Sequence, residues 1–453
     1  MQKLFDEVAT LDARCYEEFG LSEDILMEHA AEGMAAYIRA SFTKNSKVII
    51  VCGSGNNGAD GIALGRLLYA DYDVSIYYAK KPKSTMALLQ EKRAKAVDVK
   101  ECLQIEESDV LVESIVGTGF KGEFSSELKE LIKKLNKSGA FKIACDMPSC
   151  SFIADVTLTM GALKKSMFLD EAKDAVGEIR VLDLGVSRDV YETATNWNLL
   201  DLEDLQLPIR SKKDSHKGSF GHLAISCGEK SGASIMSAQS ALKFGSGLVT
   251  LVGYEDILVP YTIMYSHELP KNTTALALGM GLGNEFSDRE LDKFLDNSLP
   301  LVADADIFHM PILLEVLKRK NAVLTPHAKE FVALLKQTGL ADISVDELQK
   351  NRFKYVEIFV DAYPDVTLIL KGANVIIAQN NQFFINPHGT SSLAKGGSGD
   401  VLSGLVGALL AQGYQPINAA KNASLAHTKL ALNYKGADFS LTPDNLIAEI
   451  CNL

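Results

Sequence analysis

Short apolar runs rich in β-branched residues alternate with longer helical patterns along almost the whole chain, and this alternation limits the fold most strongly. In the first half, strands are predicted at 47–52, 73–79, 109–116, 141–146, 155–160 and 179–184, with helices between them at 59–69, 86–96 and 125–137. Strands that alternate with helices form βαβ units, which build a mostly parallel sheet covered on both faces. The sequence therefore predicts an α/β fold.

The alternation is interrupted between residues 196 and 214 by a polar, charge-rich stretch that holds Pro208. Because 453 residues are too many for one hydrophobic core, we predict two domains, at residues 1–207 and 208–453. The second half then gives strands at 222–227, 248–252, 274–278, 300–304, 322–325 and 366–370, a hairpin of 374–378 with 382–386, and a helix from 400 to about 412.

Charge and composition narrow the class of protein. The formal net charge of -12 argues against nucleic acid or an anionic membrane as the main partner. The 7 cysteines at irregular positions indicate reduced thiols rather than a disulfide framework. We see neither a signal peptide nor an apolar run of about 18 residues that could span a membrane. These features predict a soluble cytoplasmic protein.

A glycine-rich loop, Gly53-Ser54-Gly55-Asn56-Asn57-Gly58-Ala59-Asp60-Gly61, follows the first predicted strand of the alternation and leads into a helix. Glycines let a ligand approach the backbone, and a helix N-terminus offers free N–H groups to phosphate. The strand after this loop ends in Lys80-Lys81 instead of the acidic residue that holds a ribose, so a standard NAD-binding Rossmann site is not predicted. Asn56 and Asn57 supply amide groups; the alternative is that they only tolerate left-handed backbone angles.

Other strand ends of the first half carry polar groups as well. Glu113 precedes a glycine turn, and Asp146 with Ser149 ends the next strand. Ligands bind at the carboxyl ends of strands in such sheets, so Asn57, Glu113, Asp146 and Ser149 could form an oxygen cage for a hard cation such as K⁺. The alternative is a set of separate caps and turns.

Five segments of the first half resemble the NAD(P)HX epimerase family, in the right order and over about residues 1–200. They are Met27-Glu28-His29-Ala30-Ala31, the first glycine loop, Gly117-Thr118-Gly119-Phe120-Lys121-Gly122, Asp146-Met147-Pro148-Ser149 and Asp155-Val156-Thr157-Leu158-Thr159. The resemblance implies a Rossmann-like three-layer sandwich that interconverts the R and S epimers at C6 of the hydrated nicotinamide ring. It implies hydrate contacts at Asn56, Asn57, Gly58, Ala59, Asp60, Gly117, Thr118, Gly119, Phe120, Lys121, Gly122, Glu123 and Asp146, and K⁺ ligands at Asn57, Glu113 and Ser149.

Three positions depart from the family pattern, which usually has Gly at Ala59, Asp at Glu113 and Gly at Cys150. We predict Asp146 as the acid/base, since its carboxylate ends a strand at the ligand side. Lys164 is a second candidate, and the alternative for it is an exposed loop lysine beside Lys165.

A second glycine loop, Gly396-Gly397-Ser398-Gly399-Asp400, opens the predicted C-terminal helix. Small residues at a helix start form a nest of N–H donors for a transferring phosphoryl group, and Asp400 could accept the proton of an attacking hydroxyl. The alternative makes Asp400 an N-terminal cap. Other predicted strands are followed by His327, by the glycine-rich segment 279–283, and by the pair Asp304 and Asp306. Either of these two carboxylates could simply be a helix cap.

This loop resembles the anion hole and catalytic Asp of the ribokinase-like superfamily, and several segments resemble its ADP/ATP-dependent NAD(P)HX dehydratase branch over about residues 210–450. The segments are 215–222, 231–233, 245–249, 281–283, 325–327 and 396–404. The resemblance implies hydrate contacts at Ala233, Gly283, His327 and Asp400, and nucleotide contacts at Lys371, Gly372, Ala373, Asn374, Val375 and Gly399. Asp400 would deprotonate the C6 hydroxyl, residues 397–399 would hold the phosphoryl charge, and ADP or ATP with Mg²⁺ would supply the phosphate. Ala328-Lys329 replaces the family's common Pro-Gly.

The resemblance thus predicts NADHX and NADPHX as substrates, no nucleic-acid or membrane partner, and a homo-oligomer. One alternative is a small-alcohol kinase of the ribokinase superfamily fused to a non-catalytic nucleotide-binding domain. Another is a catalytically silent dinucleotide-binding protein in which the N-terminal domain serves as an interaction module, an alternative that the departures at Glu113 and Cys150 leave open for the first half.

Overall fold

The computed structural model describes residues 1–117, 119, 122–283, 286–295 and 298–453. The chain forms two compact units: the N-terminal unit, Lys3–Thr195, and the C-terminal unit, which comprises Asn196–Leu453 with Met1–Gln2. The division falls after Thr195, before the predicted boundary at 207/208, because β10 (Trp197–Leu199) pairs with β19 (Gln382–Asn386) of the C-terminal unit. No helix of the described ranges is both long and apolar enough to span a lipid bilayer.

The N-terminal unit is built on a parallel seven-stranded sheet of order β4-β3-β2-β5-β6-β7-β9. Its strands are β2 (Lys47–Cys52), β3 (Asp73–Tyr78), β4 (Lys100–Glu101), β5 (Val110–Ser114), β6 (Phe141–Cys145), β7 (Val156–Met160) and β9 (Glu178–Leu182). The strand order reverses between β2 and β5, so a ligand crevice is expected at their carboxyl ends. A short pair of β1 (Gln2–Phe5) with β8 (Leu163–Lys164) brings Leu4 beside Leu163.

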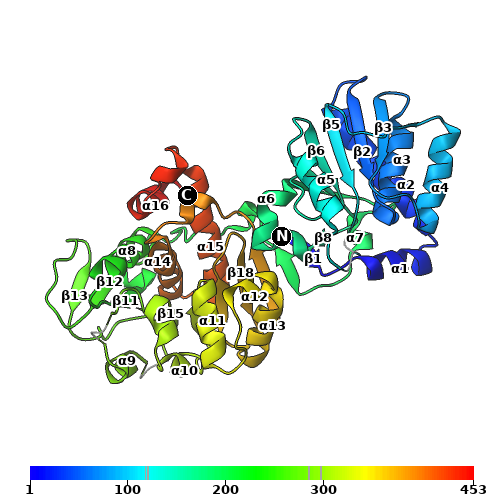
Figure 1. Ribbon diagram of the computed structural model, residues 1–453. Helices are drawn as coiled ribbons and strands as arrows, with labels where there is room; N and C mark the ends of the chain where they lie inside the picture. The colour runs from blue at the N-terminus through cyan, green and yellow to red at the C-terminus, as the bar shows by residue number, and fades with distance from the viewer. Residues whose placement is uncertain (118, 120–121, 284–285, 296–297) are drawn as a thin grey trace. The chain divides into compact units, whose positions relative to one another are not determined.

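Helices cover both faces of this sheet (Figure 1). They are α1 (Ala9–Glu18), α2 (Glu23–Ser41), α3 (Asn56–Leu68), α4 (Thr85–Ala96), α5 (Ser126–Asn136), α6 (Lys173–Val176) and α7 (Arg188–Tyr191). Because strand side chains alternate between faces, Val48, Ile50 and Cys52 join the core under α2 and α3, whereas Ile49 and Val51 join the core under α5. The predicted three-layer α/β sandwich is confirmed.

The C-terminal unit holds a larger sheet whose strands follow the order β13-β12-β11-β14-β15-β16-β17-β18-β19-β10. The strands are β11 (His222–Ser226), β12 (Leu248–Val252), β13 (Met264–Ser266), β14 (Ala275–Leu278), β15 (Leu301–Ala303), β16 (Ala322–Leu324), β17 (Thr367–Leu370) and β18 (Val375–Gln379), with β19 and β10. The strands from β13 to β17 pair in parallel, and β18 pairs antiparallel with both β17 and β19. The predicted hairpin is therefore present.

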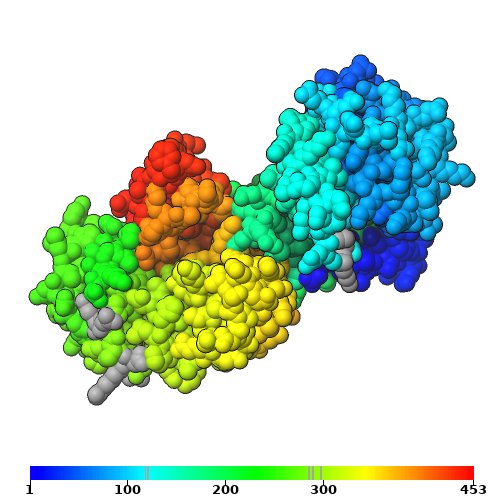
Figure 2. Space-filling model, in the orientation of Figure 1, coloured from blue at the N-terminus to red at the C-terminus, as the bar shows by residue number. Residues whose placement is uncertain are grey.

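The helices of this unit are α8 (Ser231–Lys243), α9 (Asp288–Leu295), α10 (Leu313–Val316), α11 (Ala328–Gln337), α12 (Val345–Lys350), α13 (Arg352–Ala362), α14 (Ser398–Ala411), α15 (Pro416–Asn433) and α16 (Pro443–Glu449). Helices α11 to α13, drawn in yellow, lie in front of the strands in Figure 1, and in the space-filling view their segment forms a continuous yellow surface (Figure 2).

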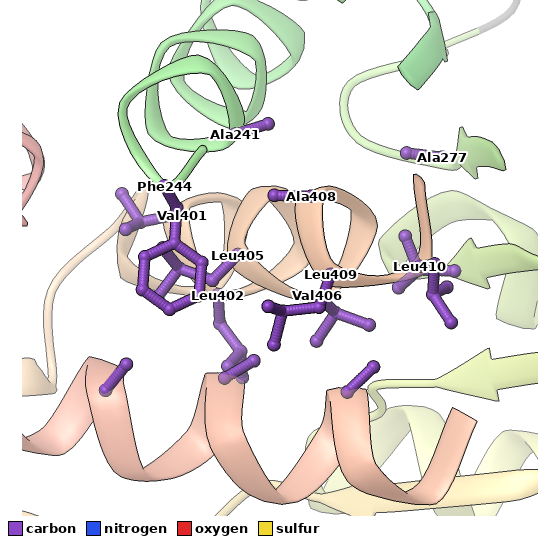
Figure 3. Close-up of a cluster of buried hydrophobic side chains, with 14 of the residues drawn as sticks. Ala241, Phe244, Ala277, Val401, Leu402, Leu405, Val406, Ala408, Leu409 and Leu410 are labelled. Carbon is purple, nitrogen blue, oxygen red and sulfur yellow. The ribbon is translucent and has the colours of Figure 1, made fainter. Parts of the chain in front are cut away.

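Helix α14 lies in the middle of the C-terminal core. Its apolar side chains, among them Val401, Leu405 and Leu409, are buried, and they contact α8 and α15 (Figure 3). A helix that is apolar on all sides must be enclosed by other elements. Gly404 allows the close approach of α8, because a Cβ there would overlap Ser240 Oγ. The second glycine loop, at the N-terminus of α14, is thereby attached to the buried core of the unit.

Candidate active sites

A cavity of about 470 Å³ opens at the carboxyl ends of the N-terminal strands. The loops after β2, β5 and β6 meet there, and helix α1 closes one side. The lining residues are Val8, Asp12, Ser54, Gly55, Asn56, Asn57, Asp60, Ile115, Val116, Gly117, Gly119, Asp146 and Met160. The cavity thus coincides with the reversal in strand order, and predicted residues from three separate loops come together in it.

The first glycine loop is shaped by steric need. A Cβ on Gly53 would overlap the carbonyl oxygen of Ile115, and a Cβ on Gly58 would overlap that of Gly53. Asn56 and Asn57 begin α3 with ordinary helical backbone, so the left-handed interpretation of these two residues is wrong. The Asn57 amide is 8% exposed, and neither its oxygen nor its nitrogen has a hydrogen-bond partner among the described residues. That amide is therefore available to a ligand.

Asp146 and Lys164 form a buried ion pair at the cavity. Lys164 Nζ, in a side chain with 0% exposure, donates to Asp146 Oδ1 at 2.6 Å and to Thr159 Oγ1 at 2.7 Å. The Thr159 hydroxyl and the Met160 amide also donate to Asp146 Oδ1, both at 3.3 Å. Lys164 is therefore not an exposed loop lysine, and the two predicted acid/base candidates act on each other directly.

Glu113 and Ser149, two predicted cation ligands, are bonded to one another. Ser149 donates its hydroxyl to Glu113 Oε1 at 2.6 Å and its amide to Oε2 at 2.9 Å, and the Ile115 amide also donates to Oε1. Burial raises the pKa of Glu113 to about 7, although the hydrogen bonds from Ser149 and Ile115 oppose that rise. Together with the free Asn57 amide, these oxygens have the chemistry that a hard cation requires.

The other residues predicted to contact the hydrate in this unit differ in their position relative to the cavity. Gly117 lies between Asp146 and Asn57, since a Cβ there would be 3.3 Å from Asp146 Oδ2 and 3.5 Å from Asn57 Cβ. Burial and the charge of Asp146 raise the pKa of Asp60 well above its ordinary value. Within the described ranges, the cavity lining does not include Gly58, Ala59, Gly122 or Glu123. Thr118, Phe120 and Lys121 lie outside the described residues.

The sequence analysis did not identify Asp12, a cavity residue, or Tyr191, which contacts it. Asp12 lies on α1 and lines the cavity, and its Oδ1 accepts a hydrogen bond from the Tyr191 hydroxyl at 2.7 Å. Helix α1 was not predicted, so nothing pointed to a carboxylate on it. Only the arrangement of α1 over the strand ends makes it visible.

In the C-terminal unit, Asp400 is held in the first turn of α14. Gly397 is the N-cap, with φ of 90°, and a Cβ on it would lie 2.6 Å from Pro443 Cγ. Asp400 is therefore not the N-cap, and the capping interpretation is wrong. Burial and then the charge of Asp304 raise the pKa of Asp400 to about 6, whereas Lys371 opposes the rise. A carboxylate with a pKa near neutrality is suited to general-base chemistry.

Lys371 and Asp304 form a second buried ion pair, next to the glycine loop. Lys371 Nζ donates to Asp304 Oδ1 at 2.7 Å, and the Ser403 hydroxyl donates to Asp304 Oδ2 at 2.7 Å. A Cβ on Gly399 would lie 3.2 Å from Lys371 Nζ. The Asp304 side chain makes no capping hydrogen bond to the short helix that follows it, so the capping interpretation of Asp304 is wrong. Ser403, which contacts Asp304, was missed by the sequence analysis.

His327 and the predicted hydrate contacts lie on neighbouring loops. His327 Nδ1 accepts the Glu330 amide at 3.1 Å at the start of α11; burial and then the charge of Lys371 lower the pKa of His327. The Lys371 amide donates to the Pro326 carbonyl at 2.9 Å, which ties the two strand ends together. The loop of Gly281 and Gly283 joins the turn before Ala233 through the Lys230 amide, which donates to the Gly281 carbonyl at 3.0 Å.

The turn from β17 to β18 holds the predicted nucleotide contacts Lys371, Gly372, Ala373, Asn374 and Val375, of which Asn374 is 2% exposed. Ser398 is within 3.1 Å of His427 Nε2, a buried imidazole on α15 that the sequence analysis missed. Burial lowers the pKa of His427 to about 4, so it is neutral at physiological pH and fixes Ser398 without adding charge to the loop.

The fold and the two sites define a bifunctional α/β enzyme, with a cavity lined by carboxyl groups in one unit and a glycine loop followed by the carboxyl group of Asp400 in the other. Residues 23–166 match the family described as YjeF-related protein N-terminus, and residues 223–452 match the family described as NAD(P)H-hydrate dehydratase. The chain is 42% identical to the bifunctional NAD(P)H-hydrate repair enzyme Nnr of Helicobacter pylori over 100% of both chains. It is 30% identical to the enzyme of the same name from Coxiella burnetii over 91% of each. The chain belongs to the family of bifunctional NAD(P)H-hydrate repair enzymes.

Among solved structures, the C-terminal part is similar to ADP/ATP-dependent NAD(P)H-hydrate dehydratase from Bacillus subtilis, co-crystallised with ATP and Mg²⁺. The two are 26% identical with a TM-score of 0.49, and the match covers 57% of this chain and 98% of that one.

Proposed function

We propose that this chain repairs hydrated nicotinamide cofactors in the cytoplasm. The N-terminal unit interconverts the R and S epimers of NADHX and NADPHX. The C-terminal unit dehydrates the S epimer to NADH or NADPH with ADP or ATP as phosphoryl donor. Membership of the bifunctional family over the whole chain favours this function over a small-alcohol kinase. The 7 cysteines at irregular positions agree with a reducing compartment.

The observation that carries the dehydratase proposal is the placement of Asp400 behind a nest of small residues and beside Lys371. The backbone amides of residues 397–399 hold the charge of the transferring phosphoryl group, and Lys371 binds the nucleotide phosphates. Asp400 takes the proton of the C6 hydroxyl as the hydroxyl oxygen attacks. Loss of phosphate from C6 and of a proton from C5 then restores the 5,6 double bond. Bound Mg²⁺ would reduce the negative charge of the nucleotide phosphates.

In the N-terminal unit, Asp146 exchanges protons with the hydrate while Lys164 fixes its orientation and stabilises its charged form. Asn57, Glu113 and Ser149 would hold K⁺, because the Asn57 amide has no partner in the described residues and the other two offer buried oxygens. K⁺ would supply a fixed positive charge at the edge of the cavity.

The test uses purified full-length protein, S-NADHX, Mg²⁺ and either ADP or ATP in parallel. The near-ultraviolet absorbance of the dihydronicotinamide should return with wild-type protein. Asp400→Asn should abolish this signal and keep nucleotide binding and epimerase activity, whereas Asp146→Asn should leave R-NADHX unconsumed beyond its spontaneous rate and keep dehydration of the S epimer. If wild-type protein regenerates no dihydronicotinamide with either nucleotide, the proposed dehydratase function is wrong.

A further inference from the structure

Besides Asp146 and Asp60, the lining of the N-terminal cavity includes the carboxyl group of Asp12, whose surroundings differ from those of Asp146. Asp12 lines the cavity from helix α1, and Asp146 lines it from the end of β6. Burial raises the pKa of Asp12, and the charge of Asp146 raises it further, whereas the charge of Lys164 opposes the rise. The two carboxyl groups therefore act on the same enclosed space from different elements.

Tyr191 holds Asp12 in a fixed position. Its side chain is 1% exposed, and its hydroxyl donates to Asp12 Oδ1 at 2.7 Å. Gly161, in the turn between β7 and β8, has φ of 72°, and a Cβ there would overlap the Tyr191 ring. Arg14 ties α1 to the same segment, because it donates to the Tyr191 carbonyl at 3.0 Å and to the Val190 carbonyl at 2.8 Å. The Asp12 carboxyl is thus preorganised.

The surroundings of the two carboxyl groups differ in charge. Asp146 accepts from the Lys164 ammonium at 2.6 Å, which stabilises the carboxylate. Asp12 accepts from the neutral hydroxyl of Tyr191, and its burial favours the protonated form. Two carboxyl groups in one cavity, one paired with an ammonium group and the other beside a neutral hydroxyl, have the arrangement in which one serves as base and the other as acid.

We propose that Asp12 is the second proton-transfer residue of the epimerase, acting as the acid to Asp146 as the base. This inference rests on the epimerase function proposed above. Asp146 takes the proton of the C6 hydroxyl, the O–H electron pair forms the C6=O bond, and the C6–N1 bond breaks. Asp12 gives its proton to N1, to which the electron pair of the broken bond has moved. After rotation about C5–C6, the reverse proton transfers close the ring with the other configuration, and no electrons are gained or lost.

The first experiment measures epimerisation of R-NADHX by full-length protein with Asp12→Asn. General acid catalysis contributes about 10²- to 10⁴-fold, so kcat should fall by at least about 100-fold with KM little changed. Dehydration of S-NADHX in the same sample should continue at the wild-type rate, which shows that the protein is intact. Glu17→Gln, an exposed carboxyl on the same helix, should epimerise like wild type.

The second experiment uses Tyr191→Phe and the pH profile of epimerisation. The Tyr191 hydrogen bond lowers the pKa of Asp12, so its loss raises that pKa, keeps the acid protonated to higher pH, and moves the alkaline limb of kcat/KM upward. A residue with only a structural role would lower the rate without moving this limb. Several other titratable groups interact with Asp12 and stay unchanged in this variant: Glu7, Cys15, Tyr16, Asp60, Asp146 and Lys164.

The outcomes separate the inference from the function on which it rests. Absence of epimerisation by wild-type protein would overturn the epimerase function itself. Wild-type epimerisation together with Asp12→Asn activity within about threefold of it would overturn only the role of Asp12, as would an alkaline limb that Tyr191→Phe leaves in place.

Discussion

The ammonium group of Lys371 donates to the carboxylate of Asp304 at 2.7 Å, and this pair lies against Gly399 of the second glycine loop. The Asp304 side chain is 3% exposed, and its other oxygen accepts the Ser403 hydroxyl from α14. The ends of β15 and β17 and the first turns of α14 are therefore joined by one polar cluster. The charge of Lys371 is thereby balanced, and its ammonium group is fixed at the place where we propose that it binds a nucleotide phosphate.

Lys371→Met should weaken both folding and nucleotide binding. It leaves Asp304 buried without its cation, and breaking a buried pair in this way costs about 3–5 kcal/mol. The KM for ADP should rise by at least about tenfold. The double variant Lys371→Met/Asp304→Asn, studied by urea unfolding, should recover most of the lost stability but not the affinity. Equal unfolding free energies for the single and double variants would contradict this account of the pair.

The dehydratase rate should fall on the acid side of about pH 6. Asp400 must be deprotonated to act as a base, and its pKa is raised to about 6 by burial and then by Asp304. Asp304→Asn removes one of the charges that disfavour the Asp400 carboxylate, so the acid limb should move to lower pH. The measurement is kcat against pH with saturating nucleotide and S-NADHX. A limb that stays in place would mean that Asp304 does not act on Asp400.

Gly399→Ala should affect nucleotide binding more than folding. The new Cβ would lie 3.2 Å from Lys371 Nζ, the far end of a flexible side chain, so the ammonium moves while the helix gains about 1 kcal/mol from the Gly-to-Ala change. We expect the KM for ADP to rise by about tenfold with unchanged or higher thermal stability. Gly232 has the same second position in α8 with open space around it, so Gly232→Ala should leave that KM unchanged.

Local patterns predicted much of the fold and part of the sites. The expected strands are present to within a few residues, as are the helices that begin at Asn56 and Ser398. Their hydrophobic periodicity and their turn residues can be recognised within a short stretch of sequence. The glycine loops were recognisable for the same reason. Helices such as α1, α2 and α15 were not predicted. Because α1 was missed, one wall of the cavity was missed with it.

The contacts that complete the sites join distant positions and leave no local pattern. Tyr191 contacts Asp12 across 179 positions, and Lys371 contacts Asp304 across 67. Each residue alone is an ordinary polar side chain in a helix or at a strand end. Only the packing of α1, or the placement of the β15 and β17 ends on either side of β16, gives each pair a shared environment.

Cys150 offers a test of backbone strain at the proposed cation site. It has φ of 57°, a left-handed conformation that costs a non-glycine residue about 1–2 kcal/mol, and it follows Ser149, which contacts Glu113. Glycine removes this cost, although its greater conformational freedom in the unfolded chain lowers the stability by about 0.4–1 kcal/mol. Cys150→Gly should therefore make the N-terminal unit more stable than Cys150→Ala by about 0.5–1 kcal/mol, the reverse of their order in a helix.

Cys150→Val should be the least stable of the three variants, because a β-branched side chain suits left-handed backbone worst. The comparison of Gly with Ala isolates the backbone, since both variants lack the thiol that packs partly buried against the core under α5. Urea unfolding, followed at the transition of the N-terminal unit, gives the three free energies. An alanine variant as stable as the glycine variant would show that the turn after Ser149 carries no strain. The departure from glycine at position 150 would then have no energetic consequence for the Glu113–Ser149 pair.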